Sequence, residues 1–380
     1  MKICSIVRYF EISEKIIINI ISFSRSKIQK NANFLHLKSS DFEVINFDDK
    51  STNEARLEME KTFKLGGKFI PFFCDEYPAN LKEINNPPPL LICLGNPEIL
   101  NNKSIAIVGS RNASYNGLHL AESFAKDLMN SGFTIVSGLA SGVDAKAHIG
   151  AIKSTIAVIG SGIDSIYPAE NKRIYTDIVK NNSAIITEFA FGVKPIPANF
   201  PQRNRIIAGI SLGTVIIEAG MKSGSLSTAR LAFEAGRDVF AIPGFALDPK
   251  YKGNNHLIKK NVAKLVEEYT EIVEEFDGID FAEKARINIL KNTVKKDHNL
   301  FDLPSQKEEK NNEKIEQDLQ EKLPENDTEI VLNNLTNQYI QINELCGRCS
   351  MSAEKIATIL MQLELEGKIQ SNGVGYCRIF

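Results

Sequence analysis

Hydrophobic residues between positions 104 and 276 are grouped in short apolar runs that alternate with longer stretches of helical periodicity. Because both faces of such a run are apolar, each run predicts a strand that is buried on both sides. The predicted strands are 105–108, 134–136, 155–159, 184–187, 214–217, 238–242 and 263–266. The predicted helices are 117–130, 143–151, 168–180, 203–209 and 226–235, with a last one that ends near Phe276. This alternation predicts an α/β fold with a doubly wound parallel sheet.

The regular pattern is absent before this region. Residues 1–60 alternate Ile-rich and Lys/Asn-rich pieces without a clear period, so they form a poorly readable N-terminal region. Strand-like segments follow at 68–73 and 90–95, and three consecutive prolines before the second segment exclude a helix there. These segments predict extended chain ahead of the regular sheet.

The C-terminal part predicts a second, smaller domain. Residues 285–327 are rich in Lys, Glu, Asn and Asp and predict a charged, solvated linker. Helices are then expected at 329–335, 342–345 and 352–366, followed by a hairpin of 368–370 and 376–379. This order is typical of a winged helix, a helix-turn-helix variant. The predicted parts are the N-terminal region (1–60), the α/β domain (61–284), the linker (285–327) and the winged helix (328–380).

Composition limits the classes of protein. The 380 residues suggest two or three domains, and the net charge of −2 requires any nucleic-acid site to be local. The apolar run from Ile16 to Ile21 is too short to span a bilayer. Of six cysteines, only Cys346 and Cys349 have C-x-x-C spacing, and no further ligands complete a zinc set. We therefore expect no metal, no cofactor and no membrane partner, and a reducing cytoplasmic location.

Glycine and serine follow nearly every predicted strand of the sheet. In a parallel sheet these positions lie at the carboxyl edge, where ligands bind. Glycine lets backbone N–H groups approach an anion, and the following helix N-terminus adds partial positive charge. One such loop is ordinary turn chemistry, but the whole set predicts a phosphate-lined cleft. The candidate residues are Gly109, Ser110, Arg111, Gly138, Ser141, Gly142, Gly160, Ser161, Lys222, Ser223, Gly224 and Ser225.

Segment 199–209 has the densest group of planar polar side chains. The seven residues from Asn199 to Arg205 include one ring, two arginines and two asparagines, directly before an apolar run. Guanidinium groups bind phosphate oxygens bidentately, and a ring can stack on a base. Solvated arginines at a helix start and a core Phe would give the same pattern. With the glycine and serine loops, the segment predicts ligand contacts for Phe200, Arg203, Asn204 and Arg205.

Common catalytic and nucleotide-binding motifs do not fit. The G-x-G-x-x-G spacing is not completed at Gly109 or Gly160, and no G-x-x-x-x-G-K-[ST] loop occurs. Asp144 and His148 lie four residues apart, which favours a helix-surface contact or a cap over a catalytic dyad. Glu218 ends a strand and could be a base, but no nucleophile is evidently paired with it. The sequence therefore predicts an anion-binding cleft rather than an enzyme.

The motifs at 109–111, 137–148, 166–168, 188–189, 199–209 and 223–230 follow one another in a characteristic order. They resemble the DNA-processing protein A family, DprA or Smf, from about residue 69 to 276 and more loosely over the winged helix. The resemblance implies a Rossmann-like domain that binds single-stranded DNA, forms a homodimer and loads RecA recombinase during natural transformation. By position, it implies that 109–111 hold a phosphate, Phe200 stacks on a base beside 203–205, and 223–225 line the far wall.

The sequence departs from this family in three places. The small SAM-like or helix-hairpin-helix domain with which the family often begins is not readable in 1–60, where it could be degenerate or absent. Ser141 stands where the family commonly has a basic residue, and His256 stands where an arginine is usual. These departures concern the N-terminal region and the rim of the cleft.

Two alternatives stay open at this point. The first is a nucleotide phosphoribohydrolase of the lonely-guy type, although its P-G-G-x-G-T-x-x-E motif is poorly matched, because Glu218 is wrongly spaced after Thr214. The second concerns the winged helix, which could bind duplex DNA or a protein. Its helix 352–366 has one lysine against three glutamates, which is poor for a phosphate-facing helix.

Overall fold

The computed structural model describes residues 13–26, 34, 36–277 and, towards the C-terminus, 325–335, 340, 342–349 and shorter pieces up to 378. The chain divides into two compact units, residues 1–303 and 304–380, and each is described by itself. The predicted linker lies outside the described residues except for 325–327. Among the described helices, none is both long and apolar enough to cross a bilayer.

The first unit is built on a sheet of nine strands in the order β1-β2-β6-β5-β4-β3-β7-β8-β9. Seven of them are parallel: β3 (Ser104–Val108), β4 (Thr134–Ser137), β5 (Thr155–Val158), β6 (Ala184–Thr187), β7 (Gly213–Ile216), β8 (Asp238–Ala241) and β9 (Lys264–Leu265). The chain runs outward from β3 to β6, then returns to the other side of β3 with β7. The doubly wound prediction is confirmed, and the strand order reverses between β3 and β7, where such sheets bind ligands.

The two strands before this region are antiparallel, which the apolar pattern alone did not reveal. Strand β1 (Lys68–Pro71) pairs with β2 (Leu90–Gly95), and β2 pairs antiparallel with β6. Five of the six residues of β2 are buried, so its sequence looks like that of a central parallel strand. Because the direction of a doubly buried strand leaves no mark on its side chains, hydrophobicity predicts the strand but not its orientation.

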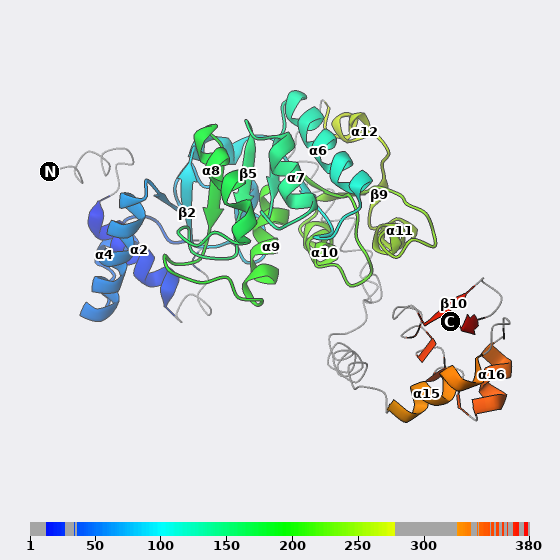
Figure 1. The fold of residues 1–380 in the computed structure, drawn as a ribbon. Coiled ribbons are helices and arrows are strands. Elements are labelled where there is room, and N and C mark those ends of the chain that lie inside the picture. The colour runs from blue at the N-terminus through cyan, green and yellow to red at the C-terminus, as the bar shows by residue number, and fades with distance from the viewer. Residues whose placement is uncertain are drawn as a thin grey trace. The chain divides into compact units, whose positions relative to one another are not determined.

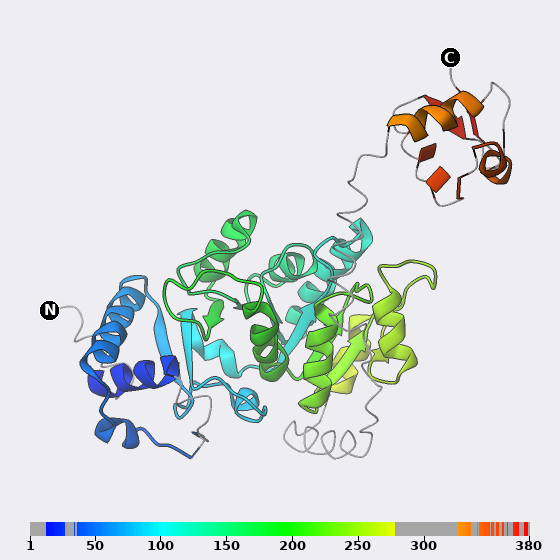
Figure 2. The same cartoon turned by 90° about the horizontal axis from the view of Figure 1, so that it is seen from below.

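Helices cover both faces of the sheet (Figures 1 and 2). On one face lie α6 (Tyr115–Asn130), α7 (Val143–Gly150) and α8 (Lys172–Lys180), and on the other α9 (Asn199–Ile210) and α10 (Ser225–Glu234). The unit also contains α5 (Ala79–Lys82), α11 (Lys252–Lys259), α12 (Tyr269–Glu275) and the 3-10 turns Pro97–Asn101 and Ala169–Asn171. Helix α9 begins four residues before the predicted start at Arg203, so Phe200 lies inside its first turn.

The described residues of the poorly readable N-terminal region include three helices. They are α2 (Glu14–Arg25), α3 (Asp41–Val44) and α4 (Asp49–Lys64). Their apolar residues belong to the same core as the sheet, because Phe23 packs on Phe34 and Phe34 on Phe72, with ring centroids 6.0 and 5.0 Å apart. Side-chain caps at Ser13 and Asp48 begin the two longer helices. The region is thus part of the first unit rather than a separate body.

The second unit contains α15 (Glu325–Asn334), α16 (Ile342–Cys349) and an antiparallel pair, β10 (Ile369–Ser371) and β11 (Tyr376–Arg378). The described residues between 355 and 363 are helical. Ile340 forms an isolated bridge with Tyr376. A small core joins these elements, and its fully buried members include Val331, Leu345, Ile356 and Leu360. The arrangement is that of the predicted helices and terminal hairpin.

Candidate functional site

The loops at the carboxyl edge are bonded to one another at the point where the strand order reverses. Ser110, after β3, donates its N–H to the carbonyl of Glu218 after β7 (2.6 Å), and its own carbonyl accepts from Val143 N (3.2 Å). Gly142 has φ 80°, and a Cβ there would lie 2.3 Å from the Ser110 carbonyl oxygen. Glycine is therefore required at this position so that the loops after β3 and β4 can meet.

Arg203 is buried beneath the edge rather than exposed on it. It is 4% exposed, and its Nη1 donates to the carbonyls of Gly138 (2.6 Å) and Val158. Burial lowers the pKa of Arg203 to about 10, although the nearby Asp144 opposes that shift. A Cβ on Gly138 would lie 2.2 Å from Nη1, so this glycine makes room for the guanidinium. Arg203 thus holds the loop after β4 against the end of β5.

Asp144 and His148 are both buried, and neither forms the expected helix-surface contact. The Asp144 carboxylate accepts from Gly138 N (3.1 Å) and Ala140 N (3.4 Å), so it acts as a cap for the loop after β4. The His148 ring meets the Thr155 hydroxyl at 2.7 Å. Burial, reinforced by the charge of Arg203, lowers the pKa of His148 to about 3. The pair therefore supports the loops and is not a catalytic dyad.

Arg205, on the next turn of α9, is held by an acid. Its Nη1 and Nη2 donate to the two carboxylate oxygens of Glu188, at 2.9 and 2.6 Å. The two side chains are only 13% and 8% exposed. This bidentate geometry fixes the guanidinium plane and occupies the donors that a phosphate would use. The prediction that Arg203 and Arg205 contact a ligand stays a prediction, while their contacts within the chain are those of positioning residues.

Phe200 is half-buried and lies among groups from two other loops. Its ring packs on Tyr167 with centroids 5.6 Å apart at 41°, and the guanidinium carbon of Arg111 lies 5.5 Å from its centroid. A Cβ on Gly160 would meet the Phe200 ring at 3.1 Å, and Asn199 donates to the Gly160 carbonyl (3.0 Å). The structure therefore brings together the loops after β3 and β5 and the first turn of α9 around one ring.

Tyr167 is the functional candidate that sequence reasoning missed. It is 45% exposed and precedes a cis proline, Pro168. The Tyr-Pro pair belongs to one of the motifs in the sequence, but nothing in its spacing places it beside Phe200. Only the fold brings the loop after β5 against α9. The two rings and the arginine together form what we call the ring platform: Tyr167, Phe200 and Arg111.

The remaining candidates divide into exposed and internally bonded groups. Lys222 and Arg111 are exposed, and Asn204 is half-buried. Ser223 and Ser225 share a hydroxyl–hydroxyl bond of 2.7 Å, and a Cβ on Gly224 between them would meet nothing. By contrast, the hydroxyl of Ser141 donates to Glu170 (2.6 Å), and that of the buried Ser161 donates to the Ser165 carbonyl (2.7 Å). The loop after β7 is the more open wall.

Glu218 has partners that argue against a role as a base. It is fully buried, and its carboxylate accepts from the N–H of Ser114 (3.0 and 3.1 Å) and from the Ser114 hydroxyl (2.7 Å). Lys250 Nζ lies 3.8 Å from the same carboxylate. Within the described part of the chain, no group of three or more His, Cys, Asp or Glu side chains could hold a metal ion. Glu218 therefore fastens the loop after β3 to β7.

Comparisons with known proteins agree with this architecture. Residues 68–277 match the family model described as DNA recombination-mediator protein A, and residues 316–373 match the DprA winged helix domain. The chain is 45% identical over 206 residues to the DNA processing protein DprA of Streptococcus pneumoniae, covering 53% of this chain and 72% of that protein. It is 34% identical over 314 residues to the protein Smf of Escherichia coli, covering 82% and 77%.

Solved structures give the same result. An X-ray structure of DprA from Streptococcus pneumoniae superposes with a TM-score of 0.55 at 35% identity, covering 71% of this chain and 95% of that one. A structure concerned with the single-stranded DNA binding mode of DNA processing protein A from Helicobacter pylori has a TM-score of 0.51 at 28% identity, covering 55% and 94%. The chain belongs to the DNA recombination-mediator protein A family, the DprA and Smf proteins, and carries its winged-helix domain.

Proposed function

We propose that this protein binds single-stranded DNA at the carboxyl edge of its sheet, without chemical turnover. The observation that carries the proposal is the ring platform, in which Phe200 and Tyr167 lie together beside the exposed Arg111. Stacking on a ring tolerates any base, because every base has a π face, and an exposed guanidinium can meet the adjacent phosphate. A strand with unpaired bases offers both groups, whereas a duplex hides its base faces.

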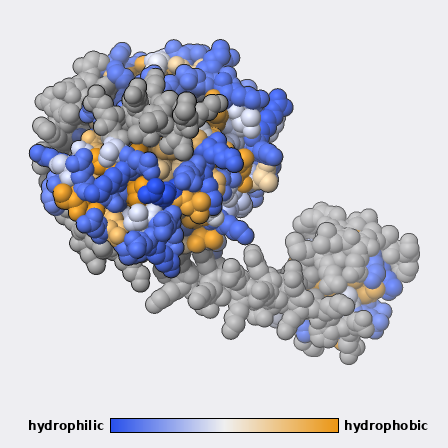
Figure 3. Space-filling view, turned by 90° about the vertical axis from the view of Figure 1, so that its left-hand side faces the viewer, coloured by the Kyte–Doolittle hydropathy of each residue, from blue (hydrophilic) through white to orange (hydrophobic). Residues whose placement is uncertain are grey.

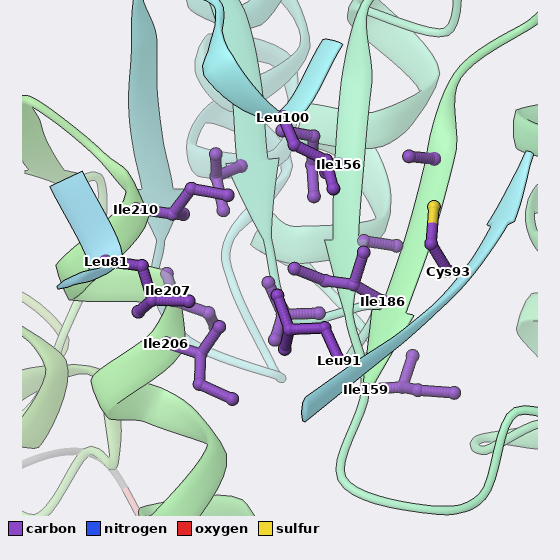
Figure 4. Close-up of a cluster of buried hydrophobic side chains, with 14 of the residues drawn as sticks. Leu81, Leu91, Cys93, Leu100, Ile156, Ile159, Ile186, Ile206, Ile207 and Ile210 are labelled. Carbon is purple, nitrogen blue, oxygen red and sulfur yellow. The ribbon is translucent and has the colours of Figure 1, made fainter. Parts of the chain in front are cut away.

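The platform is supported from below by apolar packing. Ile206, Ile207 and Ile210 of α9 are buried in the same cluster as residues of the sheet, among them Leu91, Ile156 and Ile186, as Figure 4 shows. The middle of the helix is fixed by the bonds of Arg203 and Arg205. Binding a flexible strand costs ordering free energy, so a receptor whose stacking ring is already fixed loses less on binding. In this proposal, the α9 arginines orient Phe200 and Arg111 contacts phosphate.

The absence of turnover is supported by the state of the acids near the edge. Glu218 is fully buried and bonded to Ser114, and Asp144 is bonded to the loop after β4. Both carboxylates are buried and hydrogen-bonded within the chain, as expected of groups that position loops. The comparisons also do not favour the alternative, a nucleotide phosphoribohydrolase, since they identify DNA-processing proteins. The further proposals are that the protein forms a homodimer and loads RecA recombinase onto the strand during natural transformation, in the cytoplasm.

The test of the proposal is base stacking at Phe200. Phe200→Ala should weaken binding of an oligothymidine by about 1–3 kcal/mol in a fluorescence-anisotropy titration, because one base loses its ring partner. Phe200→Tyr keeps the aromatic face and should bind like the wild type. Phe200→Leu keeps apolar bulk without the ring and should bind like Phe200→Ala. Equal affinity of all three variants and the wild type would overturn the proposal.

A further inference from the structure

The N-terminal helices contact the segment before α9 through one arginine. Arg25, the last residue of α2, donates from Nη1 to the main-chain carbonyl of Glu188 (2.8 Å). Its Nε and Nη2 donate to the two carboxylate oxygens of Glu58 on α4, at 3.1 and 2.7 Å. The Arg25 and Glu58 side chains are 26% and 10% exposed. A fork-to-fork pair with a third bond to a carbonyl fixes two helices and a loop at once.

Glu58 extends this contact to the other end of the same segment. Its Oε1 accepts from the main-chain N–H of Phe191 at 3.3 Å, and Lys61 of the same helix lies 5.9 Å from the Phe191 ring centroid. Residues 188–191 therefore have their first carbonyl and their last N–H held by α2 and α4. This segment leaves β6 and leads towards α9.

The same segment is bonded to α9 by a side chain. Glu188 gives its carbonyl to Arg25 and its carboxylate to Arg205, so a single residue joins the N-terminal helices to the helix that carries Phe200. Four charged residues thus form a continuous series that passes through the main chain of Glu188: Glu58, Arg25, Glu188 and Arg205. We call this series the brace.

Attachment of the N-terminal helices does not depend on the brace. Their apolar side chains already join the main core, and Phe23, Phe34 and Phe72 form a chain of ring contacts. Figure 3 views the side of the molecule on which α4 lies, where hydrophilic residues dominate and hydrophobic ones form small patches. The brace is therefore an additional, directional set of contacts, and it is placed at the segment that leads to the ring platform.

We propose that Arg25 and Glu58 are positioning residues for the ring platform, so that the N-terminal helices set the orientation of Phe200 without touching DNA. The proposal rests on the proposed function of the platform. Stacking depends on ring orientation, and Arg205 restrains α9 only as firmly as Glu188 is itself held. Without Arg25, the Glu188 carbonyl loses its donor and the Glu58 carboxylate loses two of its donors but keeps the Phe191 N–H, so segment 188–191 is held less firmly.

The first experiment compares two arginines of the N-terminal helices in the full chain. Arg25→Ala should weaken oligothymidine binding by between about 2-fold and 30-fold, the range expected for a residue that acts through its neighbours. The dependence of affinity on salt should stay the same, because no phosphate contact is removed. Arg56→Ala is the matched control, since Arg56 forms only a half-exposed pair with Glu14 at 3.4 Å. Wild-type affinity of Arg25→Ala in a folded protein would overturn the proposal.

A double-mutant cycle separates positioning from a general loss of stability. If the brace acts through the ring, Arg25→Ala should have almost no effect on affinity in a Phe200→Ala background. An equal effect in both backgrounds would overturn the proposal while leaving the function of the platform intact. If Phe200→Ala alone leaves affinity unchanged, the proposed function fails. A loss of affinity in Arg25→Ala would then show that Arg25 acts on binding by a route other than Phe200, which also overturns the proposal for the brace. Should Arg25→Ala fold poorly, Glu58→Gln keeps the side-chain volume and weakens the same pair.

Discussion

The loop after β3 and helix α9 both carry arginine guanidinium groups, but the one on the loop is exposed and those on the helix are bonded within the chain. Arg111 is exposed and lies 5.5 Å from the Phe200 ring centroid. Arg203 lies 6.0 Å from the same centroid, but it and Arg205 are turned inward and bonded to carbonyls and to Glu188. The helix has the higher density of arginine in the sequence, yet the loop has the guanidinium that solvent and a ligand can reach. A group of arginines in a sequence therefore does not measure the positive charge available at a site.

The difference follows from where each side chain leaves the backbone. Arg203 points below the edge, where the carbonyl ends of two strands and the buried Asp144 need a donor and a cation. Arg111 lies on a loop beyond the end of its strand, so its side chain can reach only solvent and the ring beside it. Removal of a buried arginine should therefore lower stability, whereas removal of the exposed arginine should lower DNA affinity.

The largest expected effect is at Arg203. Arg203→Ala leaves the buried Asp144 without a counter-charge and two carbonyls without a donor, so the free energy of unfolding should fall by about 3–5 kcal/mol. Urea denaturation of the full chain measures it. The matched control is Arg173→Ala on α8. Because the Arg173 side chain is 92% exposed, this change should alter the free energy of unfolding by less than about 0.5 kcal/mol. Unchanged stability with lost DNA binding would instead place Arg203 at the ligand.

The next effect concerns pH and the histidine beneath the same loops. The ring of His148 is buried, and its Nε2 has no hydrogen-bond partner, so the neutral form is favoured. Since the folded-state pKa is about 3 and the unfolded reference is 6.5, only the unfolded chain binds a proton between these values. Stability from this group is full above pH 6.5 and should fall by roughly 1 kcal/mol per pH unit below it.

The check is a comparison of slopes. Urea denaturation at pH 7.5, 6.5 and 5.5 should give a steeper loss for the wild type than for His148→Gln, which cannot become charged. Parallel slopes would mean that the pKa of His148 is similar in the folded and the unfolded protein, so that its ring would be hydrated rather than buried beside Arg203.

The strands and the core were predictable because they depend on hydrophobic runs that the sequence displays directly. Ile105 to Val108 could only be a doubly buried strand, and Ile206 and Ile207 could only face the core. The antiparallel direction of β2 was not predictable, since both orientations bury the same residues. The N-terminal helices were missed because the apolar residues of α2 form a nearly continuous run, which does not distinguish a buried helix from a buried strand.

The site was predictable in composition but not in geometry. The glycines at 138 and 160 were expected to approach a ligand, yet in the structure they make room for Arg203 and Phe200. Tyr167 was given no role because its partnership with Phe200 depends on the packing of a loop against α9. The pair of Arg205 and Glu188 joins residues 17 positions apart, a separation that no helix or strand period brings together, so only the folded chain reveals it.

The smallest effect on stability is expected at Arg111. Because its side chain is exposed, Arg111→Ala should change the free energy of unfolding by less than about 0.5 kcal/mol. Affinity for single-stranded DNA should nevertheless fall by the same factor for all sequences. The slope of log K against log[salt] should decrease by the amount expected for about one phosphate contact. Titrations at several salt concentrations measure this, with Arg173→Ala as the exposed control. A loss of stability like that of Arg203→Ala, or an unchanged salt dependence, would show that Arg111 is also tied within the chain, and the distinction between the two classes of arginine would disappear.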